Sequence, residues 1–198
     1  MDLKQTRRRG SELETAILDA AWDQLIEKGY RDFTFEAVAA RAGTSRPVLY
    51  RRWADRGELL RQAIRHGNNR TPIEVPDTGT LRDDVITLIS RFNAARADYA
   101  AVLGVQLAEY FRETGTSLND LRDLMRTGRG SAMQQILDRA QARGDVDLSK
   151  LTPRAIEMPV ALAHHELVMT MAPVSYATIT EIVDDLWLPM LQARGALL

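Results

Sequence analysis

One arginine-rich segment, residues 33–60, constrains the fold of this chain more than any other. It reads FTFEAVAARAGTSRPVLYRRWADRGELL. Thr34 can cap a helix on which Val38 and Ala42 recur at the four-residue spacing of one face. Gly43 then ends that helix, since glycine readily adopts the conformation that terminates helices. The pattern predicts a short helix, a tight turn and a second short helix.

The second helix begins with residues that favour a helix start. Ser45 is a natural N-cap, and Pro47 fits the first turn, where its missing N–H and fixed φ are harmless. At about 100° per residue, Leu49 and Trp53 share one face and can pack on the first helix. The opposite face carries Pro47, Val48, Tyr50 and Arg51. Two short helices in this arrangement form a helix-turn-helix, so double-stranded DNA is the leading partner.

The outward face has the chemistry that a major groove requires. Arg51 can donate two hydrogen bonds to a guanine edge, and Pro47 or Val48 can touch a thymine methyl group. Tyr50, together with arginines beside it, can hold phosphates. Without its helix-turn-helix frame the same cluster would be an ordinary solvated arginine face. The residues expected to bind DNA are Thr34, Thr44, Arg46, Pro47, Val48, Tyr50, Arg51, Arg52 and Arg56.

Net charge agrees with this interpretation once it is divided along the chain. The formal charge is −1 at pH 7. Residues 1–66 hold 13 Lys and Arg against 10 Asp and Glu, whereas residues 67–198 hold 13 against 17. The first part therefore has a surplus of three positive charges, and the second a surplus of four negative ones. A basic head on an acidic body suits a protein that approaches nucleic acid with one end.

These residues resemble the pattern of the tetracycline-repressor-like (TetR) family of bacterial regulators. The upstream run AILDAAWDQLIEKGY, residues 16–30, is similar to the family's first helix. Trp53 stands where the family usually has Phe, Arg56 where it usually has Lys, and Pro47 where a small residue is common. Pro47 alters the groove-facing surface, so a relative's operator sequence does not transfer. The matching positions are Thr34, Val38, Ala39, Ala42, Gly43, Ser45, Leu49, Tyr50, Trp53, Arg56, Glu58, Leu59 and Leu60.

Domain organisation follows from a change of composition after His66. Residues 67–80, GNNRTPIEVPDTGT, are rich in Gly, Pro and Asn and indicate a boundary. We expect a helix-turn-helix domain with its linking helix over residues 1–66, and an all-helical ligand-binding and dimerisation domain over residues 67–198. Helical periodicity predicts body helices at 81–98, 99–113, 118–143, 153–172 and 179–193. With three helices in the head and a linking helix from Arg56 to about Arg65, the chain is expected to be all-α with about nine helices, which resembles the family's plan.

The last two predicted helices carry long apolar stripes that need covering. The resemblance implies that this pair forms a four-helix bundle with a second subunit, and a two-fold dimer also suits a palindromic operator. The alternative is that both helices complete the subunit's own core. Pro159 and Pro189 lie inside them and predict kinks or restarts. The residues expected at the dimer interface are Leu167, Met171, Ile182, Val183, Leu186, Trp187 and Met190.

The predicted body mixes aromatic, methionine and a few polar side chains, which suit an apolar pocket as well as an ordinary core. The resemblance implies a small apolar ligand. The two helix-turn-helix heads of a dimer stand at a fixed distance when they bind DNA. A ligand that prefers a body with another distance between the heads lowers DNA affinity by the linked free energy. Arg56 with the segment to Arg65 would transmit the change from the body to the head. The candidate ligand contacts are Phe92, Leu103, Gln106, Tyr110, Met125, Met133, His165 and Met169.

Other chemistry is sparse. The chain has no cysteine, and of its three histidines the adjacent pair His164 and His165 cannot share a helix face. We expect no catalytic residue, metal or cofactor, no membrane partner and a cytoplasmic location, since no apolar run approaches membrane-spanning length. The sequence thus predicts a dimeric, ligand-responsive DNA-binding transcriptional regulator, a repressor rather than an activator, although an activator would have the same head. The alternative is an all-helical small-molecule-binding, enzymatic or adaptor protein without sequence-specific DNA binding.

Overall fold

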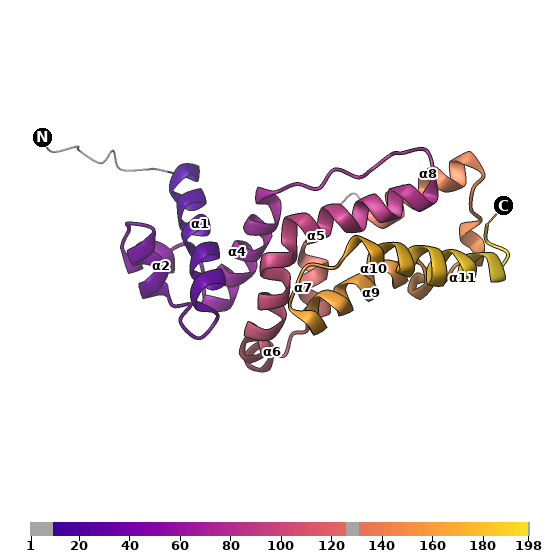
Figure 1. The fold of residues 1–198 in the computed structure, drawn as a ribbon. Coiled ribbons are helices and arrows are strands. Elements are labelled where there is room, and N and C mark those ends of the chain that lie inside the picture. Colours follow the sequence, from indigo (N-terminus) through magenta and orange to yellow (C-terminus); the bar gives the residue numbers. More distant parts are fainter. Residues whose placement is uncertain (1–9, 126–130, 198) are drawn as a thin grey trace, which may run out of the picture. The chain divides into compact units, whose positions relative to one another are not determined.

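The computed structural model describes residues 10–125 and 131–197, except for the side chains at 96–106, 119, 122, 124 and 125. The regular elements of this part are helices, with one isolated antiparallel bridge between Val146 and Leu197, which confirms the all-α class (Figure 1). The chain divides into two compact units. The first comprises residues 1–72 with 105–125, and the second comprises residues 73–104 with 126–198.

The first unit is built around the predicted pair of short helices. Thr34 caps α2 by accepting a hydrogen bond from the amide of Ala37 at 3.1 Å, as expected. Asp55 caps α4 in the same way, accepting from the amide of Glu58 at 2.7 Å. The helices of this unit are α1 (Ser11–Lys28), α2 (Phe35–Arg41), α3 (Arg46–Tyr50), α4 (Arg56–Arg70), α6 (Ala108–Thr114) and α7 (Leu118–Met125).

Helix α4 extends beyond its predicted end at about Arg65 and continues to Arg70. Gly67, which the sequence analysis placed at the start of a linker, is a buried helical residue against Trp22. A Cβ atom at this position would lie 2.1 Å from Cδ2 of Trp22, so only glycine allows this approach. The prediction of the helix end was wrong because composition marked Gly67 as a breaker, whereas tertiary packing requires it.

The second unit holds the remaining helices, and part of α5. That helix passes from the second unit into the first between Gly104 and Val105 without interruption. A π-helical segment, η2, separates α10 from α11. The elements are α5 (Leu81–Gln106), α8 (Ala132–Arg143), η1 (Leu148–Lys150), α9 (Pro153–Thr170), α10 (Tyr176–Glu181), η2 (Ile182–Trp187) and α11 (Leu188–Ala193).

Several predicted helix boundaries in the body were wrong. The break expected between residues 98 and 99 occurs at Leu107, because α5 continues to Gln106. The single helix expected over 118–143 is two helices, and Ser131 starts the second by accepting from the amide of Gln134. Residues 126–130, which include the Gly128–Gly130 segment, lie outside the described residues.

The two internal prolines behave differently. Pro159 lies within the uninterrupted helix α9, so a restart there was not needed. Pro189 lies two residues after the end of η2, and the amide of Leu188 donates to the carbonyl of Val183 in the wider π pattern. Proline cannot donate a backbone hydrogen bond, so it interrupts the regular α-helical pattern. The π-helical pattern supplies the neighbouring backbone groups with partners. The irregularity predicted at Pro189 is therefore present in the preceding turn.

Trp187 is the centre of the second unit's core. Its side chain is fully buried, and its indole N–H donates to the carbonyl of Ala155 at 2.7 Å, which joins η2 to α9. Apolar residues of α5 and α8, among them Val85, Leu88 and Ile136, belong to the same core. Burial of this kind is the main stabilising term for a helical domain of this size.

The segment 73–80, which we name the strap, joins α4 to α5 and is held in place within the second unit. Arg91 donates to the carbonyl of Glu74 at 2.8 Å, and Arg139 donates to the carbonyl of Pro76. The amide of Thr78 donates to the buried carboxylate of Asp84 at 2.6 Å. The strap passes along α5 (Figure 1). It is thus an anchored segment rather than the loose linker that its composition suggests.

Candidate nucleic-acid interface

The turn between α2 and α3 sets the direction of the second helix. Gly43 has a φ of +66°, the left-handed conformation that favours glycine, and the amide of Thr44 donates to the carbonyl of Ala39 at 2.9 Å. Leu49 and Trp53 are buried, as the helical spacing predicted. These contacts fix the opposite face of α3 toward solvent. A short helix held by a glycine turn and two buried anchors is the geometry of a helix-turn-helix.

The residues predicted to bind DNA are mostly exposed. Val48 and Arg56 are half-buried, Thr44 lies in the turn, and Thr34 is occupied in capping α2. Their contact with DNA stays a prediction, because exposure shows access and not recognition. The exposed members of the set are Arg46, Pro47, Tyr50, Arg51 and Arg52.

Arg46 and Tyr50 form one connected group. The guanidinium of Arg46 lies 2.6 Å from a carboxylate oxygen of Glu36 and donates to the hydroxyl of Tyr50 at 2.8 Å. Its Cζ atom lies 5.1 Å from the centroid of the Tyr50 ring. The ring in turn meets Phe35 edge to face, with centroids 4.6 Å apart. Tyr50 is therefore held in a defined position although half of its surface is exposed.

The other arginines of this region differ in their pairing. Arg52 donates to Glu14 of α1 at 3.0 Å, and Arg56 donates to Glu113 of α6 at 2.8 Å. Arg51 has no ion-pair or hydrogen-bond partner for its side chain within the described part of the chain. It is therefore the arginine of this group that is exposed and has no partner there.

A second cluster joins α6 to α1 and α4 within the first unit. The hydroxyl of Tyr30 donates to the same Glu113 oxygen at 2.7 Å, and Cζ of Arg56 lies 4.0 Å from the Tyr30 ring centroid. Tyr110 packs edge to face on Tyr30, with centroids 5.5 Å apart, and its hydroxyl accepts from Arg61 at 3.4 Å. We name this group the α6 cluster. Sequence reasoning missed Tyr30 and Glu113, since no spacing rule connects residues so far apart in the chain.

The α6 cluster shifts the pKa values of its members in opposite directions. The pKa of Glu113 is lowered, first by the hydrogen bond from Tyr30 and then by the one from Arg56. The pKa of Tyr30 is raised to about 12, first by burial and then by its hydrogen bond to the Glu113 carboxylate. Both shifts favour the state in which a neutral phenol donates to a charged carboxylate.

The predicted ligand residues do not come together in one site. Tyr110 is buried in the first unit, whereas Met133 is buried in the core of the second and Phe92 packs against that core. His165 and Met169 are exposed. The side chains of Leu103, Gln106 and Met125 lie outside the described residues.

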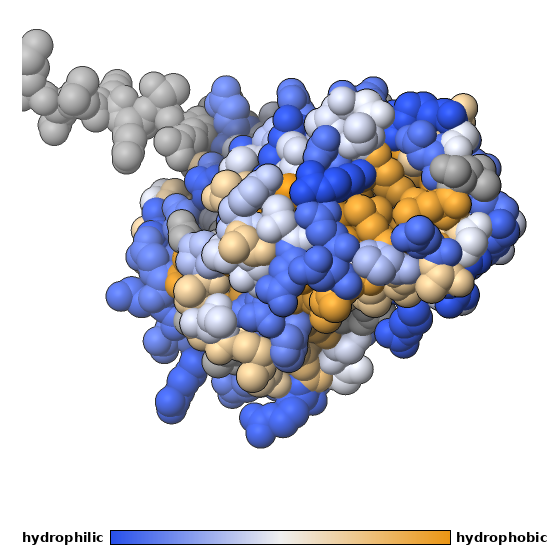
Figure 2. All heavy atoms as spheres, turned by 45° about the vertical axis from the view of Figure 1, so that its right-hand side comes forward, coloured by the Kyte–Doolittle hydropathy of each residue, from blue (hydrophilic) through white to orange (hydrophobic). Residues whose placement is uncertain are grey.

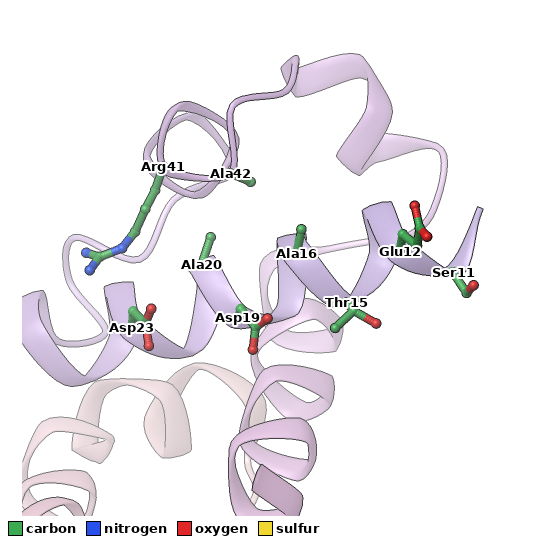
Figure 3. Close-up of a pocket in the computed structure, with 9 residues that line it drawn as sticks. All are labelled: Ser11, Glu12, Thr15, Ala16, Asp19, Ala20, Asp23, Arg41 and Ala42. Carbon is green, nitrogen blue, oxygen red and sulfur yellow. The ribbon is translucent and has the colours of Figure 1, made fainter. Parts of the chain in front are cut away.

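One cavity of about 600 Å³ lies in the first unit, and none of the predicted ligand residues lines it. It is an open groove between α1 and α2 with an acidic lining. Figure 3 shows Arg41 reaching from α2 toward α1, where Asp19 and Asp23 lie. Arg41 is paired with Glu27, and Asp19 and Asp23 are paired with Arg70, so these three charged groups of the lining already have partners within the first unit.

The residues predicted at the dimer interface fall into two groups. Leu167, Ile182, Val183 and Trp187 are buried in the subunit's own core, and Met190 packs against it. Met171 and Leu186 are exposed, as are Met169 and Tyr176, two residues that the prediction did not place there. Figure 2 shows hydrophobic residues gathered on the face in view, on a surface that is otherwise largely hydrophilic. Contact of either group with a second subunit stays a prediction.

The described residues show neither a metal site nor a membrane-spanning helix. No group of three or more His, Cys, Asp or Glu side chains there is placed to hold a metal ion. None of the helices described is both long enough and apolar enough to cross a membrane.

These features define a helix-turn-helix DNA-binding protein. Residues 17–63 match the family described as bacterial regulatory proteins, tetR family, and residues 75–186 match the tetracyclin repressor-like C-terminal domain. The chain belongs to the TetR family, and it is a helix-turn-helix transcriptional regulator, as the sequence predicted. Regulators of this family bind operator DNA and act as dimers, and repression with release by a ligand is typical of them.

Individual relatives agree with this placement. An HTH-type transcriptional regulator of Mycobacterium tuberculosis is 30% identical over 179 residues, which cover 90% of this chain and 87% of the relative. The DNA-binding transcriptional repressor TetR of Mycobacteroides abscessus is 28% identical over 93% of this chain and 96% of its own. A TetR-family structure from Mesorhizobium loti has the same fold, with a TM-score of 0.63 and 16% identity over 94% of this chain and 98% of that one.

Proposed function

We propose that this regulator is a dimeric repressor that reads its operator with α3 and leaves it when a small apolar molecule binds the body. In functional terms, residues 1–66 bind DNA and residues 67–198 carry dimerisation and ligand response. A cytoplasmic location follows from a DNA partner. The observation that carries the DNA-binding part is the unpaired, exposed guanidinium of Arg51 at the end of α3.

Arg51 is the side chain best suited to read a base. Because the Arg51 guanidinium has no hydrogen-bond or ion-pair partner among the described residues, its donors can turn toward the N7 and O6 atoms of guanine. Arg52 and Arg56 are each held by a carboxylate from another helix, so they are less free to turn toward a base edge and suit a role in orienting the head. The proposed roles are therefore base recognition for Arg51 and orientation for the other two.

The exposed apolar residues of the second unit support the dimer. Tyr176 is 66% exposed and Leu186 is 48% exposed, and they occur with exposed Met169 and Met171. Aromatic and methionine side chains are enriched at protein interfaces, and exposed patches of this kind mark association surfaces. We propose these four residues as the central contacts between two copies of the chain, supported from within by the buried Trp187 and its neighbours.

The α6 cluster supports a route for ligand response. It ties the start of α4 to α6 through Arg56 and Glu113, and α6 follows directly after the long helix α5. A ligand that binds better to a body with another head spacing shifts the population away from the DNA-binding form. Heads that leave the roughly 34 to 36 Å separation of successive major grooves lose affinity for the operator. A coupling of roughly 1 to 3 kcal/mol corresponds to a change of about five- to 150-fold.

The test is fluorescence anisotropy of the purified protein with DNA from upstream of its own gene, at two salt concentrations. We expect tight, salt-dependent binding that is lost with a scrambled duplex, and Arg51→Ala should cost about 1 to 3 kcal/mol of operator affinity. Arg65→Ala is the matched control, because it removes an exposed arginine of α4 beyond the helix-turn-helix. If Arg51→Ala and Arg65→Ala have equal effects, the proposed reading face is wrong. If no natural fragment binds, selection from random DNA supplies the operator.

A further inference from the structure

Carboxylates from three different helices contact the arginines of the proposed DNA-binding face. Glu14 of α1 pairs with Arg52, and Glu113 of α6 pairs with Arg56. In these pairs the arginine is the less exposed partner; the first pair joins α1 to the residues that follow α3, and the second joins α6 to α4. Both ion pairs therefore connect separate helical segments of the first unit.

The pair formed by Glu36 and Arg46 is different. It joins α2 to α3, and its side chains are 55% and 54% exposed. Exposed ion pairs contribute little to stability, so fold maintenance does not explain this one. The pair lies beside Tyr50, which is itself part of the outward face of α3.

We propose that Glu36 is a positioning residue that increases discrimination between operator and other DNA, and that it acts through Arg46. The proposal rests on the DNA-binding face put forward above. Glu36 holds the Arg46 guanidinium against the ring and hydroxyl of Tyr50, and thereby withholds it from phosphates that the protein meets on random sequences.

The effect on random DNA follows from electrostatics. Non-specific binding comes almost entirely from phosphate neutralisation by Lys and Arg. A guanidinium that shares its donors with a carboxylate 2.6 Å away offers less to a phosphate. Glu36 therefore weakens binding to every sequence that relies on loosely placed phosphate contacts.

The contact between Glu36 and Arg46 also affects the operator complex, because it orders side chains before DNA binds. Arg46 donates to Tyr50, and Tyr50 packs on Phe35, so the outward side chains of α3 are ordered before DNA arrives. Pre-ordered side chains lose less conformational entropy on binding, and this advantage belongs to the complex that uses their observed positions. Glu36 consequently lowers non-specific affinity and leaves operator affinity nearly unchanged.

The experiment measures the affinity of the full-length protein for a random duplex and for the operator by anisotropy, at low and at moderate salt. The variants are Glu36→Gln, Arg46→Gln and the double variant, which together form a double-mutant cycle. Glu109→Gln is the matched control, because it removes an exposed carboxylate of the first unit with the same change in net charge. Arg51→Ala is measured in parallel.

We expect Glu36→Gln to raise affinity for the random duplex by about two- to fivefold at low salt, with a smaller gain at moderate salt. The ratio of operator to random affinity should fall by a similar factor. In the Arg46→Gln background the same substitution should change random-duplex affinity by less than about 1.5-fold, because the partner through which it acts is gone.

Two results would overturn the proposal. One is an equal gain for Glu36→Gln and Glu109→Gln, which would assign the effect to net charge alone. The other is an equal gain with and without Arg46, which would show that Glu36 does not act through it. If the proposed DNA-binding face itself is wrong, Arg51→Ala will not weaken operator binding. That result distinguishes failure of the proposed function from failure of the Glu36 proposal.

Discussion

The outward side of the helix-turn-helix and the α9–α11 region differ in the kind of surface that their buried core supports. Around α3, a small buried core of Leu49 and Trp53 supports a surface of arginines, most of which have a carboxylate partner. In the α9–α11 region, a large core around Trp187 supports a surface that keeps apolar side chains exposed. Charge is balanced internally at the first surface. At the second, apolar area is left over after the subunit's own core is complete.

This difference indicates that the surface around α3 is selective in what it binds, whereas the surface of the α9–α11 region favours association. Internally paired charges limit association with any polyanion and leave one guanidinium for selective contact. Exposed apolar side chains favour association with a matching apolar surface. The comparison predicts that single substitutions change stability most at the core around Trp187 and least at the ion pairs of the first unit.

The largest effect is expected at Trp187. Trp187→Ala leaves a large cavity and an unpaired carbonyl at Ala155, so it should lower the free energy of unfolding by about 3 to 5 kcal/mol. The measurement is urea denaturation at fixed protein concentration, since the stability of a dimer depends on concentration. A loss below about 1 kcal/mol would contradict the packing described for η2.

Leu186→Ala is the matched substitution one position earlier. Its side chain is exposed, so the unfolding free energy of the subunit should change by less than about 0.5 kcal/mol, measured at a protein concentration that keeps the chain monomeric. Self-association, followed by sedimentation equilibrium, should weaken instead. Unchanged association would remove Leu186 from the proposed dimer contacts.

A packing change in the first unit tests whether its stability also depends on close contacts. Gly67→Ala places a Cβ atom 2.1 Å from Trp22, and the shift this forces should lower the free energy of unfolding by about 1 to 3 kcal/mol. Asn69→Ala, an exposed neighbour on α4, serves as the control and should differ little from the native chain. Equal urea midpoints for the two variants would contradict the close approach of α4 to α1.

An ion pair of the first unit should matter less. Glu14→Gln removes the partner of Arg52 and should lower the free energy of unfolding by less than about 1 kcal/mol, an effect that added salt reduces. Thermal unfolding at low and high salt measures it. A larger loss that persists in high salt would show that this contact holds the fold together.

A pH dependence of stability is expected from the α6 cluster. The pKa of Tyr30 is raised from 10.0 to about 12 in the folded state, so its contribution to stability is complete below pH 10 and is lost as the pH rises toward 12. The pKa of Glu113 is lowered, so its contribution is present above its ordinary pKa and is lost as the pH falls below it. Urea midpoints across pH should show this plateau.

Tyr30→Phe and Glu113→Gln test the assignment separately. Tyr30→Phe should reduce the decline between pH 10 and 12, and Glu113→Gln should reduce the decline on the acid side. A decline of full size in both variants would assign the pH dependence to other groups.

Local pattern was sufficient for the helix-turn-helix. Cap, turn and buried anchors at Thr34, Gly43, Leu49 and Trp53 lie within one short segment, so spacing alone placed them correctly. Long-range contacts were not accessible in the same way. The α6 cluster joins Tyr30 to Glu113, and only the folded chain brings them together.

The apolar stripes of the last helices show a different limit. Periodicity identifies a face that avoids water, but it does not say whether the same subunit or another covers it. Ile182, Val183 and Trp187 were expected at an interface and are buried within the subunit, while exposed Tyr176 was missed because the helix was expected to begin at Ile179. The predicted ligand residues stay a prediction for the same reason, since composition alone suits a pocket and a core equally.

The passage of α5 between the two units has a practical consequence for dissecting this regulator. The first unit is discontinuous in sequence, so cleavage in the strap after Pro72 would not release it whole. The N-terminal fragment would lack Tyr110 and Glu113, and Tyr30 would lose both its ring contact and its hydrogen-bond acceptor. Proteolysis at the strap should thus yield a fragment that holds the helix-turn-helix sequence but exposes an aromatic surface that the intact chain keeps covered.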